Sequence, residues 1–324
     1  MPLESGTPLV CPICQRVDTR PEFPHASGPA LRYPLVRCSG CGLVFLEELR
    51  DEVQLDDAQR TAYGEPQKRF MGPFELLVRG FRLARARSAA RLMPPGGSVL
   101  DVGCGRGLFL SLLRERGHEV KGTELSAATV RNAYPDLPIS IGDLRPGLFP
   151  DASFDLVSIW HVLEHLRFPD RALEAAFRAL RPGGRLMLAV PNYGSVQARL
   201  GGEGWFHLDP PRHIFQFTDH TLRQLVRGGG FEIERCRTGQ WEMDPFGLLQ
   251  SLLNRAGFRH NALYDTIRNN PADKADLSLL ARAAMLALLP FGMALALPAS
   301  LALRLAGRAG TLILVARKPP GSGV

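Results

Sequence analysis

Three glycines at alternate positions, Gly103, Gly105 and Gly107, separate an apolar run from a helical pattern. Glycine lets a backbone turn tightly and approach a ligand closely, because it has no Cβ. The spacing is G-x-G-x-G, which differs from the G-x-G-x-x-G of a dinucleotide site. Asp101 stands just before the loop and offers a carboxylate to a cationic amino-acid group. The pattern favours a nucleotide-like cofactor with a cationic end, although an ordinary strand-to-helix turn would use the same glycines.

Two further carboxylates stand at the ends of the next two predicted strands. Residues 98–102 and 118–123 are short runs typical of strands, and Glu124 ends the second one. A carboxylate roughly 20 residues past a glycine loop can accept hydrogen bonds from both hydroxyls of a ribose. A third strand over 139–142 leads into Asp143. That side chain can reach an adenine amino group, and its alternative role is to cap a loop.

These motifs, with the strand Phe154–His161 and the turn Arg181–Arg185, resemble the class I S-adenosylmethionine-dependent methyltransferases. The resemblance covers roughly residues 70–238 and a last strand near the C-terminus. It implies an α/β fold with a doubly wound, seven-stranded Rossmann-like sheet that binds the cofactor at the carboxyl ends of its first strands. The cofactor contacts that it implies are Asp101, Gly103, Gly105, Gly107, Glu124, Asp143 and Trp160.

Four histidines are candidates for the general base that a hydroxyl or acidic-carbon acceptor requires. His161 and His165 follow the fourth predicted strand, whereas His207 and His213 follow the fifth. Three interpretations of the first pair remain open. One of the two is the base, or His165 binds a divalent metal together with Glu164, as similar Glu-His pairs do in quinone O-methyltransferases, or the cluster is structural.

The segment around His207 and His213 interleaves polar side chains with aromatic ones, as a substrate pocket does. Arg212 could hold a phosphate or carboxylate of the substrate, and Asp209 belongs to the same pocket. The family that the chain resembles carries a similar Asp-x-Pro-Arg-His run here. We therefore expect the acceptor to bind next to this segment.

Two C-x-x-C pairs near the N-terminus, Cys11 with Cys14 and Cys38 with Cys41, supply four soft ligands. Structural zinc takes such a set in tetrahedral geometry, and a redox pair or a ribbon without metal are the alternatives. The strand pattern after Cys41 resembles the zinc-ribbon arm of bacterial methyltransferases that act on cell-surface sugars and secondary metabolites. Cys104 and Cys236 are expected to be packing residues.

The chain has 324 residues, of which 45% are hydrophobic, enough for one large catalytic domain with additions. We expect five segments: a zinc ribbon at 1–46, a linker at 47–66, the methyltransferase core at 67–238, a hydrophobic helical insertion at 239–308, and the last core strand and tail at 309–324. A helix within 68–92 should cover the cofactor site with its arginines on a solvated face. These are Arg79, Arg82, Arg85, Arg87 and Arg91.

Residues 283–303 form an uncharged run between Arg282 and Arg304, long enough to span a bilayer. The last predicted strand, 310–318, must join the same sheet as the others, so a single crossing is excluded. Two interpretations remain. The run is a helical hairpin, broken near Pro290 or Pro298, that dips into one leaflet, or it is a cap packed on the core or on a second subunit.

The net charge of +7 permits an anionic partner such as RNA, an acidic lipid or a nucleotide-sugar. Cysteines in metal-ligand pairs and the lack of a signal-like start predict a cytoplasmic protein, peripheral on the inner face of the membrane. The sequence thus predicts methyl transfer to O or C of a small or lipid-linked acceptor, such as a sugar, quinone or secondary metabolite. The alternatives are an rRNA or tRNA methyltransferase, although no Asn-Pro-Pro-Tyr motif follows the fourth strand, and a non-catalytic binding module.

Overall fold

The computed structural model describes residues 10–24, 33–47, 73–134, 136–267 and 278–321. Its central sheet has seven strands in the order β10-β11-β8-β7-β4-β5-β6. The neighbours from β8 to β6 are parallel, and β11 lies antiparallel to both β8 and β10. The strands are β4 (Ser98–Val102), β5 (Glu119–Glu124), β6 (Ile139–Ile141), β7 (Phe154–Trp160), β8 (Leu180–Pro191), β10 (Glu232–Thr238) and β11 (Thr311–Arg317). The predicted α/β fold class is therefore confirmed.

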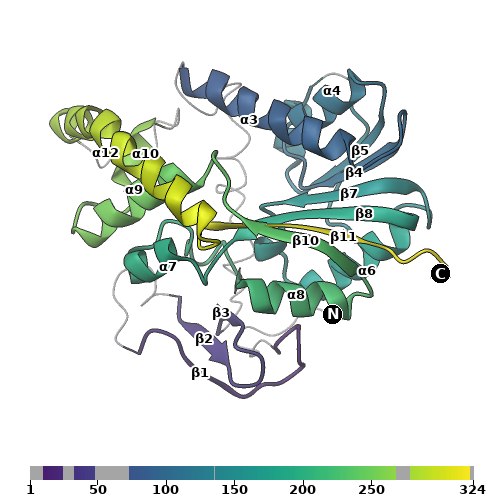
Figure 1. Cartoon of the computed structure of the whole chain (residues 1–324), viewed down its shortest axis with the longest axis horizontal. Helices are drawn as coiled ribbons and strands as arrows, with labels where there is room; N and C mark the ends of the chain where they lie inside the picture. The colour runs from purple at the N-terminus through teal and green to yellow at the C-terminus, as the bar shows by residue number, and fades with distance from the viewer. Residues whose placement is uncertain (1–9, 25–32, 48–72, 135, 268–277, 322–324) are drawn as a thin grey trace.

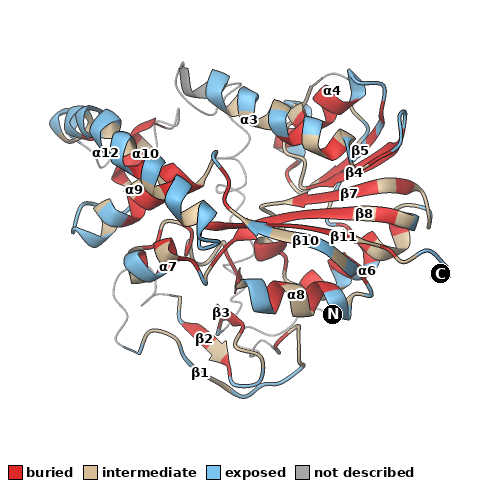
Figure 2. Cartoon of the chain, viewed as in Figure 1, coloured by how far each residue is buried: buried red, intermediate tan, exposed pale blue. Residues whose placement is uncertain are grey.

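Helices cover both faces of this sheet (Figure 1). On one face lie α3 (Pro73–Ala90), α4 (Leu108–Arg114) and α5 (Ala127–Arg131), and on the other lie α6 (Pro169–Ala179) and α8 (Asp219–Gly228). Neighbouring residues of a strand point to opposite faces. In β4, Val99 packs against Phe109, whereas Leu100 belongs to the core on the side of Leu173. The central strands β4, β7, β8 and β11 are consequently buried on both faces (Figure 2), as a doubly wound fold requires.

The N-terminal segment forms a second, four-stranded sheet together with β9, which comes from the main domain. Its order is β1-β2-β3-β9, and its strands are β1 (Thr19–Pro21), β2 (Leu35–Cys38), β3 (Val44–Leu46) and β9 (Phe215–Gln216). The rings of Phe45 and Phe215 lie 6.2 Å apart, and both side chains are buried in the larger hydrophobic core. The ribbon therefore extends the catalytic core instead of standing apart from it. The predicted linker at 47–66 lies outside the described residues except for Glu47.

Three helices lie between β10 and β11: α9 (Asp244–Arg255), α10 (Ala262–Ile267) and α12 (Leu279–Leu305). The remaining short helices are α7 (Val196–Gly201) and two 3₁₀ turns, η2 (Leu163–His165) and η3 (Gly202–Gly204). Helices α7, α9, α10 and α12 lie near the end of the sheet where β8 ends and β11 begins (Figure 1). The turn η3 contacts α7 and α9.

Of the two interpretations of residues 283–303, the helical hairpin is wrong. Helix α12 is one continuous helix that contains both Pro290 and Pro298. A proline removes one backbone hydrogen bond and strains the preceding turn, but packing elsewhere can hold a helix together. Met285 is buried before the first proline, and Ala296 and Ser300 are buried on either side of the second. Contacts of these side chains with neighbouring helices keep the axis continuous.

Candidate cofactor and acceptor site

The glycine loop joins β4 to α4 and has the geometry of a ligand cradle. Gly103, Gly105 and Gly107 have φ angles of 66°, 58° and 82°, a region that disfavours side chains. A Cβ at Gly103 would collide with Val162, and one at Gly107 would collide with Leu137. A Cβ at Gly105 would meet no atom within 4 Å. The loop is therefore packed tightly from behind and has open space at its middle residue, where a ligand can approach the backbone.

Glu124 lies at the carboxyl end of β5, beside this loop. Its Oε2 accepts a hydrogen bond from the backbone N–H of Gly105 at 3.0 Å, and its Oε1 accepts one from Ser126 at 3.1 Å. Each carboxylate oxygen keeps capacity for a second hydrogen bond, so both can still receive ribose hydroxyls. Asp143 follows β6 at the same edge of the sheet and is exposed. The residues predicted to bind the ribose and the adenine thus lie on adjacent strand ends.

Asp101 has a partner that the sequence analysis missed. It is buried at the end of β4, and Arg85 of α3 reaches it with Nη2 at 2.7 Å. The same Nη2 lies 2.7 Å from the Ser158 hydroxyl, and the guanidinium sits over the rings of Phe109 and Trp160, at 3.9 and 4.6 Å from their centres. Burial lowers the pKa of Arg85 to about 10, which keeps it charged at neutral pH.

The expectation that the α3 arginines are all solvated is therefore wrong for Arg85. Arg79, Arg87 and Arg91 are exposed, as expected, and Arg82 is half-buried at 3.3 Å from Glu242. The buried Asp101 carboxylate needs a compensating charge, and Arg85 supplies it from the covering helix. Ala86 and Ala89 next to it are also buried, so a small-residue face of α3 was the available signal.

His161 follows β7 directly and is held between two hydrogen-bond acceptors. Its Nε2 lies 2.8 Å from Oε1 of Gln240, and its Nδ1 lies 3.4 Å from Oε1 of Glu164. Gln240 donates its amide to Glu242 at 3.1 Å, which leaves its oxygen for His161. Burial acts to lower the pKa of His161, but the Glu164 carboxylate outweighs it and raises that pKa. His161 therefore forms a hydrogen bond with Gln240 and a charge contact with Glu164, and this contact favours the protonated ring.

Glu164, His165 and His213 bring three potential ligand atoms within 4.8 Å of one another. Nδ1 of His165 donates to the carbonyl of Arg212 at 2.9 Å, and Nδ1 of His213 donates to that of His207 at 2.6 Å. Each ring therefore keeps an Nε2 lone pair, and the ring centres are 4.6 Å apart.

The charge state of this cluster suits a metal ion. The Glu164 side chain is 1% exposed, and among the described residues neither of its oxygens has a hydrogen-bond partner of good geometry. Burial would raise the pKa of Glu164, but the hydrogen bond to His161 and the surrounding histidines lower it to about 2. Burial also lowers the pKa of His213 to about 4, so this ring is neutral. Two imidazoles and one carboxylate form a recognised ligand set for divalent transition metals.

The remaining residues predicted for the acceptor pocket are divided between two environments. His207 is buried, its Nε2 has no partner among the described residues, and burial lowers its pKa well below the usual value. Arg212 and Asp209 pair with each other at 2.6 Å at a half-buried position. The structure thus brings His161, Glu164, His165 and His213 together and ties Asp209 to Arg212.

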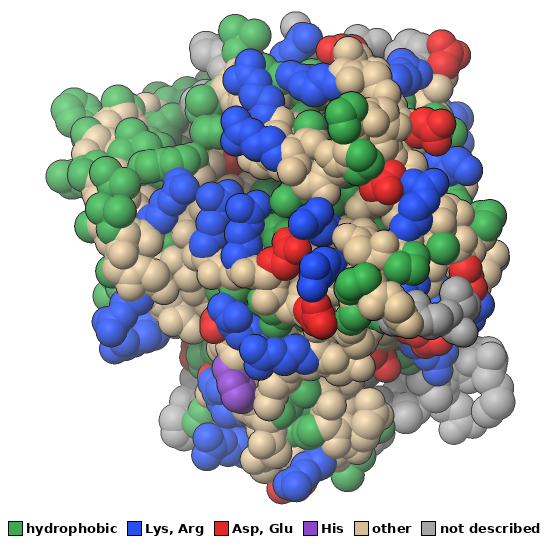
Figure 3. Space-filling view, turned by 45° about the vertical axis from the view of Figure 1, so that its right-hand side comes forward, with side chains coloured by type: hydrophobic (Ala, Val, Ile, Leu, Met, Phe, Trp, Pro, Cys, Tyr) green, Lys and Arg blue, Asp and Glu red, His purple; other side chains and the backbone are tan. Residues whose placement is uncertain are grey.

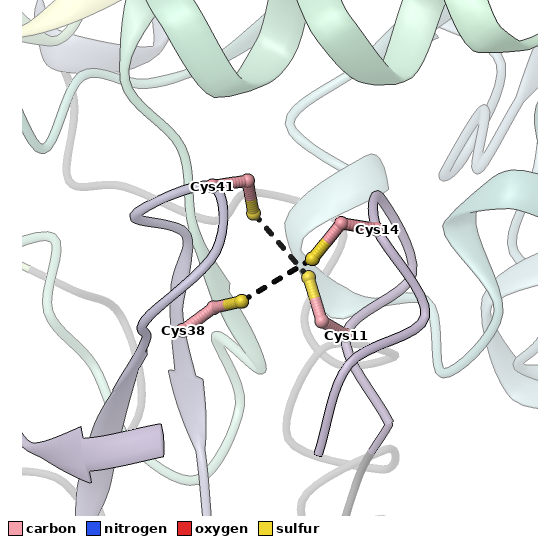
Figure 4. A group of neighbouring side chains, drawn as sticks. All are labelled: Cys11, Cys14, Cys38 and Cys41. Atoms are coloured by element: carbon pink, nitrogen blue, oxygen red, sulfur yellow. Dashed lines mark hydrogen bonds between the residues drawn. The ribbon is translucent and has the colours of Figure 1, made fainter. Parts of the chain in front are cut away.

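The four ribbon cysteines converge on one point (Figure 4). The Sγ atoms of Cys11 and Cys41 lie 3.4 Å apart, as do those of Cys14 and Cys38. A tetrahedral zinc site with Zn–S bonds of about 2.3 Å separates its sulfurs by about 3.8 Å. The set fits such an ion after a shift of a few tenths of an ångström. Cys104 packs against the hydrophobic core on the α4 side of the sheet, and Cys236 packs against the core on the other side.

Comparison with known proteins identifies the central part of the chain. Residues 78–235 match the family described as "Methyltransferase domain". A probable S-adenosylmethionine-dependent methyltransferase from Mycolicibacterium smegmatis is 33% identical over 43% of this chain and 53% of the relative. A ubiquinone biosynthesis O-methyltransferase from Idiomarina loihiensis is 34% identical over 30% of this chain and 43% of the relative. The chain thus spans about half the length of these two curated relatives.

A solved structure has the same fold over most of its length. The putative methyltransferase in a complex with the Trm112 methyltransferase activator of Haloferax volcanii gives a TM-score of 0.50. It is 20% identical and covers 84% of this chain and 99% of that chain. This likeness concerns the fold alone. The family match and the curated relatives thus show what residues 78–235 are similar to, namely a methyltransferase domain, and one of these relatives is named as a probable S-adenosylmethionine-dependent enzyme.

Proposed function

We propose that this chain transfers a methyl group from S-adenosylmethionine to an oxygen or carbon atom of a small or lipid-linked acceptor. A sugar, a quinone or a secondary metabolite is such an acceptor. The observation that carries the proposal is the loop at Gly103–Gly107, with open space over Gly105 and the Glu124 carboxylate beside it. The name of the Idiomarina loihiensis relative supports a small-molecule hydroxyl as acceptor. No observation on the described residues favours RNA over a small molecule.

The residues divide the work of binding the cofactor and preparing the acceptor. Bound cofactor supplies an electrophilic methyl group, and the chain must orient the acceptor and lower the cost of losing its proton. Glu124 and Asp143 hold the nucleoside in this proposal, and the Arg85–Asp101 pair fixes α3 over the loop. His161, held protonated by Glu164, donates hydrogen bonds and does not serve as the base.

The acceptor side rests on Glu164, His165 and His213. A divalent ion held by these residues would lower the pKa of an acceptor hydroxyl. This role is favoured over a plain base because the Glu164 carboxylate is buried without a good hydrogen bond. His207 has an unpartnered Nε2, but burial lowers its pKa well below the usual value and makes this ring a weak proton acceptor.

The ribbon cysteines Cys11, Cys14, Cys38 and Cys41 are proposed to hold structural zinc. Strand β3 of the ribbon pairs with β9, which begins two residues after His213. Zinc would therefore stabilise the segment that carries this histidine.

Calorimetric titration of the purified full chain with S-adenosylmethionine and S-adenosylhomocysteine, with metal analysis of the same sample, tests the function. Micromolar binding with about one zinc per chain is the expected result. A folded, zinc-loaded sample that binds neither compound would support the non-catalytic binding module. If the sample binds the cofactor, an acceptor screen with that sample follows.

A further inference from the structure

The helix α12 presents a wide apolar surface to solvent. It is the one helix among the described residues that is long and apolar enough to cross a bilayer. Its most apolar 18-residue stretch has a mean hydropathy of 2.0, and 11% of that stretch is buried in the protein. At about 100° per residue, Leu286 and Leu288 stand about 200° apart around its axis, and both are exposed. Phe291 and Leu295 lie between them on the exposed side and are 74% and 75% exposed. No charged residue occurs from Ala283 to Leu303.

A cluster of arginines adjoins the C-terminal end of this helix. Arg304 and Arg235 lower the pKa of Arg237 through their like charges, which add to its partial burial. None of the ion pairs among the described residues includes any of these three arginines. Figure 3 shows the hydrophobic projection at one side of the molecule with Lys and Arg side chains next to it. Three positive charges without a close ion pair among the described residues, next to an apolar surface, are complementary to an anionic surface.

Trp241 lies at the boundary between the apolar and the basic surface. It is 40% exposed, and the Arg304 guanidinium sits 5.7 Å from the centre of its ring. Exposed tryptophan next to arginine is typical of protein surfaces at the level of lipid headgroups. The preceding residue, Gln240, bonds His161 of the catalytic domain. The boundary is therefore connected to the candidate acceptor site through adjacent residues.

We propose that α12, with Trp241 and the Arg235–Arg237–Arg304 cluster, binds the surface of an anionic lipid bilayer. The helix lies in the plane of the interface, with its apolar arc among the acyl chains and the arginines at the phosphates. Met285, Ala296 and Ser300 face the protein, so the other side of the helix remains packed on it. The site at the carboxyl ends of the strands then lies close to the membrane, which suits an amphiphilic acceptor. This last point alone rests on the proposed function.

The width of the arc distinguishes a bilayer from a second copy of the chain. A single helix partner covers a stripe of about 100° and would leave roughly half of this arc in water. A bilayer surrounds the whole arc. In a symmetric dimer formed through α12, these arginines would find no carboxylate on the partner helix. The run between Arg282 and Arg304 contains none.

The test is sedimentation of the full zinc-loaded protein with phosphatidylcholine vesicles, with and without phosphatidylglycerol. We expect binding to the anionic vesicles that weakens with added salt. The double substitution Phe291→Asp and Leu295→Asp should reduce binding at least about tenfold, because two charges enter the acyl region. Val17→Asp, at a 67% exposed position of the ribbon, is the matched control and should bind as the wild type does.

The arginine contribution is measured separately. Arg235→Gln and Arg237→Gln should each weaken binding to anionic vesicles about fivefold and reduce its salt dependence. Trp241 fluorescence should shift to shorter wavelength on vesicle binding, and Trp241→Phe should remove that shift. Trp205 is buried in the core, so it does not report on the vesicle.

Three results would overturn the proposal: no vesicle binding by the wild type, equal binding by the Phe291→Asp and Leu295→Asp variant, or binding independent of phosphatidylglycerol. A lipid-free dimer that the same variant dissociates, without vesicle binding, would assign the surface to a second copy. Cofactor titration on every sample separates this test from the test of the proposed function, since lipid binding needs no cofactor.

Discussion

The backbone N–H of Ile214 donates a hydrogen bond to the carbonyl oxygen of Glu164 at 2.8 Å. The carbonyl of Ile214 in turn accepts one from Leu46 of the ribbon at 3.0 Å. One residue therefore ties the turn after β7 to the N-terminal sheet, next to His213. This connection makes the ribbon part of the support of the candidate acceptor site.

Loss of zinc should loosen this connection. Cys38→Ser removes one ligand, so we expect loss of the metal, a lower melting temperature and faster amide exchange at Leu46 and Ile214. Hydrogen exchange by mass spectrometry on the segments around these residues measures the effect. Cys236→Ser, which alters a cysteine outside the ribbon, should keep zinc and normal exchange. Unchanged exchange at Ile214 in a zinc-free ribbon would refute the coupling.

The ribose role of Glu124 is tested by Glu124→Ala. We expect cofactor affinity to fall at least about tenfold, since two hydrogen bonds to a charged acceptor are worth about 1.5–3 kcal/mol each. Calorimetry measures the affinity, and circular dichroism checks the fold. Glu119→Gln, at an exposed position of the same strand, is the control. Cofactor binding equal to that of the wild type would remove Glu124 from the site.

The metal cluster predicts a second ion in addition to zinc. We expect Co²⁺ to give a visible absorption band with the full chain, and Glu164→Gln to abolish it, because a neutral amide is a poorer ligand. The ribbon could also bind Co²⁺, so the titration is done on zinc-loaded protein. His220→Gln, which alters a histidine on α8 outside the cluster, should leave the band intact. A spectrum that does not change on Glu164→Gln would exclude this set of ligands.

The Arg85–Asp101 pair should be strongly coupled in stability. Arg85→Met leaves a buried carboxylate without its partner, and we expect a loss of about 3–5 kcal/mol in the free energy of unfolding. Adding Asp101→Asn should recover part of this loss, because the uncompensated charge is then gone. Denaturant unfolding of the two single variants and the double variant gives the coupling energy. Additive effects of the two substitutions would contradict a direct ion pair.

Asp244 predicts a specific pH dependence of stability. Burial raises the pKa of this carboxyl to about 6, even though it accepts hydrogen bonds from Thr311 and Gln240. Because the pKa of Asp244 is raised in the folded state, its carboxyl contributes most to stability at a pH below its unfolded pKa of 3.8. This contribution is lost as the pH rises through the folded pKa of about 6. The size of the loss is about 3 kcal/mol at most.

Asp244→Asn removes that titration and keeps an oxygen for Thr311. We therefore expect the variant to gain stability relative to the wild type as the pH rises from about 4 to about 7. Denaturant midpoints across this range measure the difference between the two proteins. A constant difference over the range would show that Asp244 does not titrate there.

The local patterns were sufficient for the parts of the fold that depend on neighbouring residues. The G-x-G-x-G spacing predicted the turn after β4, and an apolar run predicted β4 itself, because a buried parallel strand is apolar on both faces. The placement of Glu124 next to Gly105 followed from the same logic, since parallel strands end at one edge. The roles of these residues toward the cofactor stay predictions.

Tertiary structure decided the features that join distant parts of the chain. The small-residue face of α3 indicated only that Arg85 lies near the core, and nothing in the sequence paired it with Asp101 or Gln240 with His161, because each contact depends on how one element packs over another. The uncharged run at 283–303 likewise allowed a hairpin, whereas packing at Met285 and Ala296 holds one helix. Sequence alone determined the strands, the glycine loop and the cysteine pairs, which arise from local backbone preference and spacing. Only the folded chain determined which charges are paired and which apolar surface is left open, because burial is set by the whole molecule.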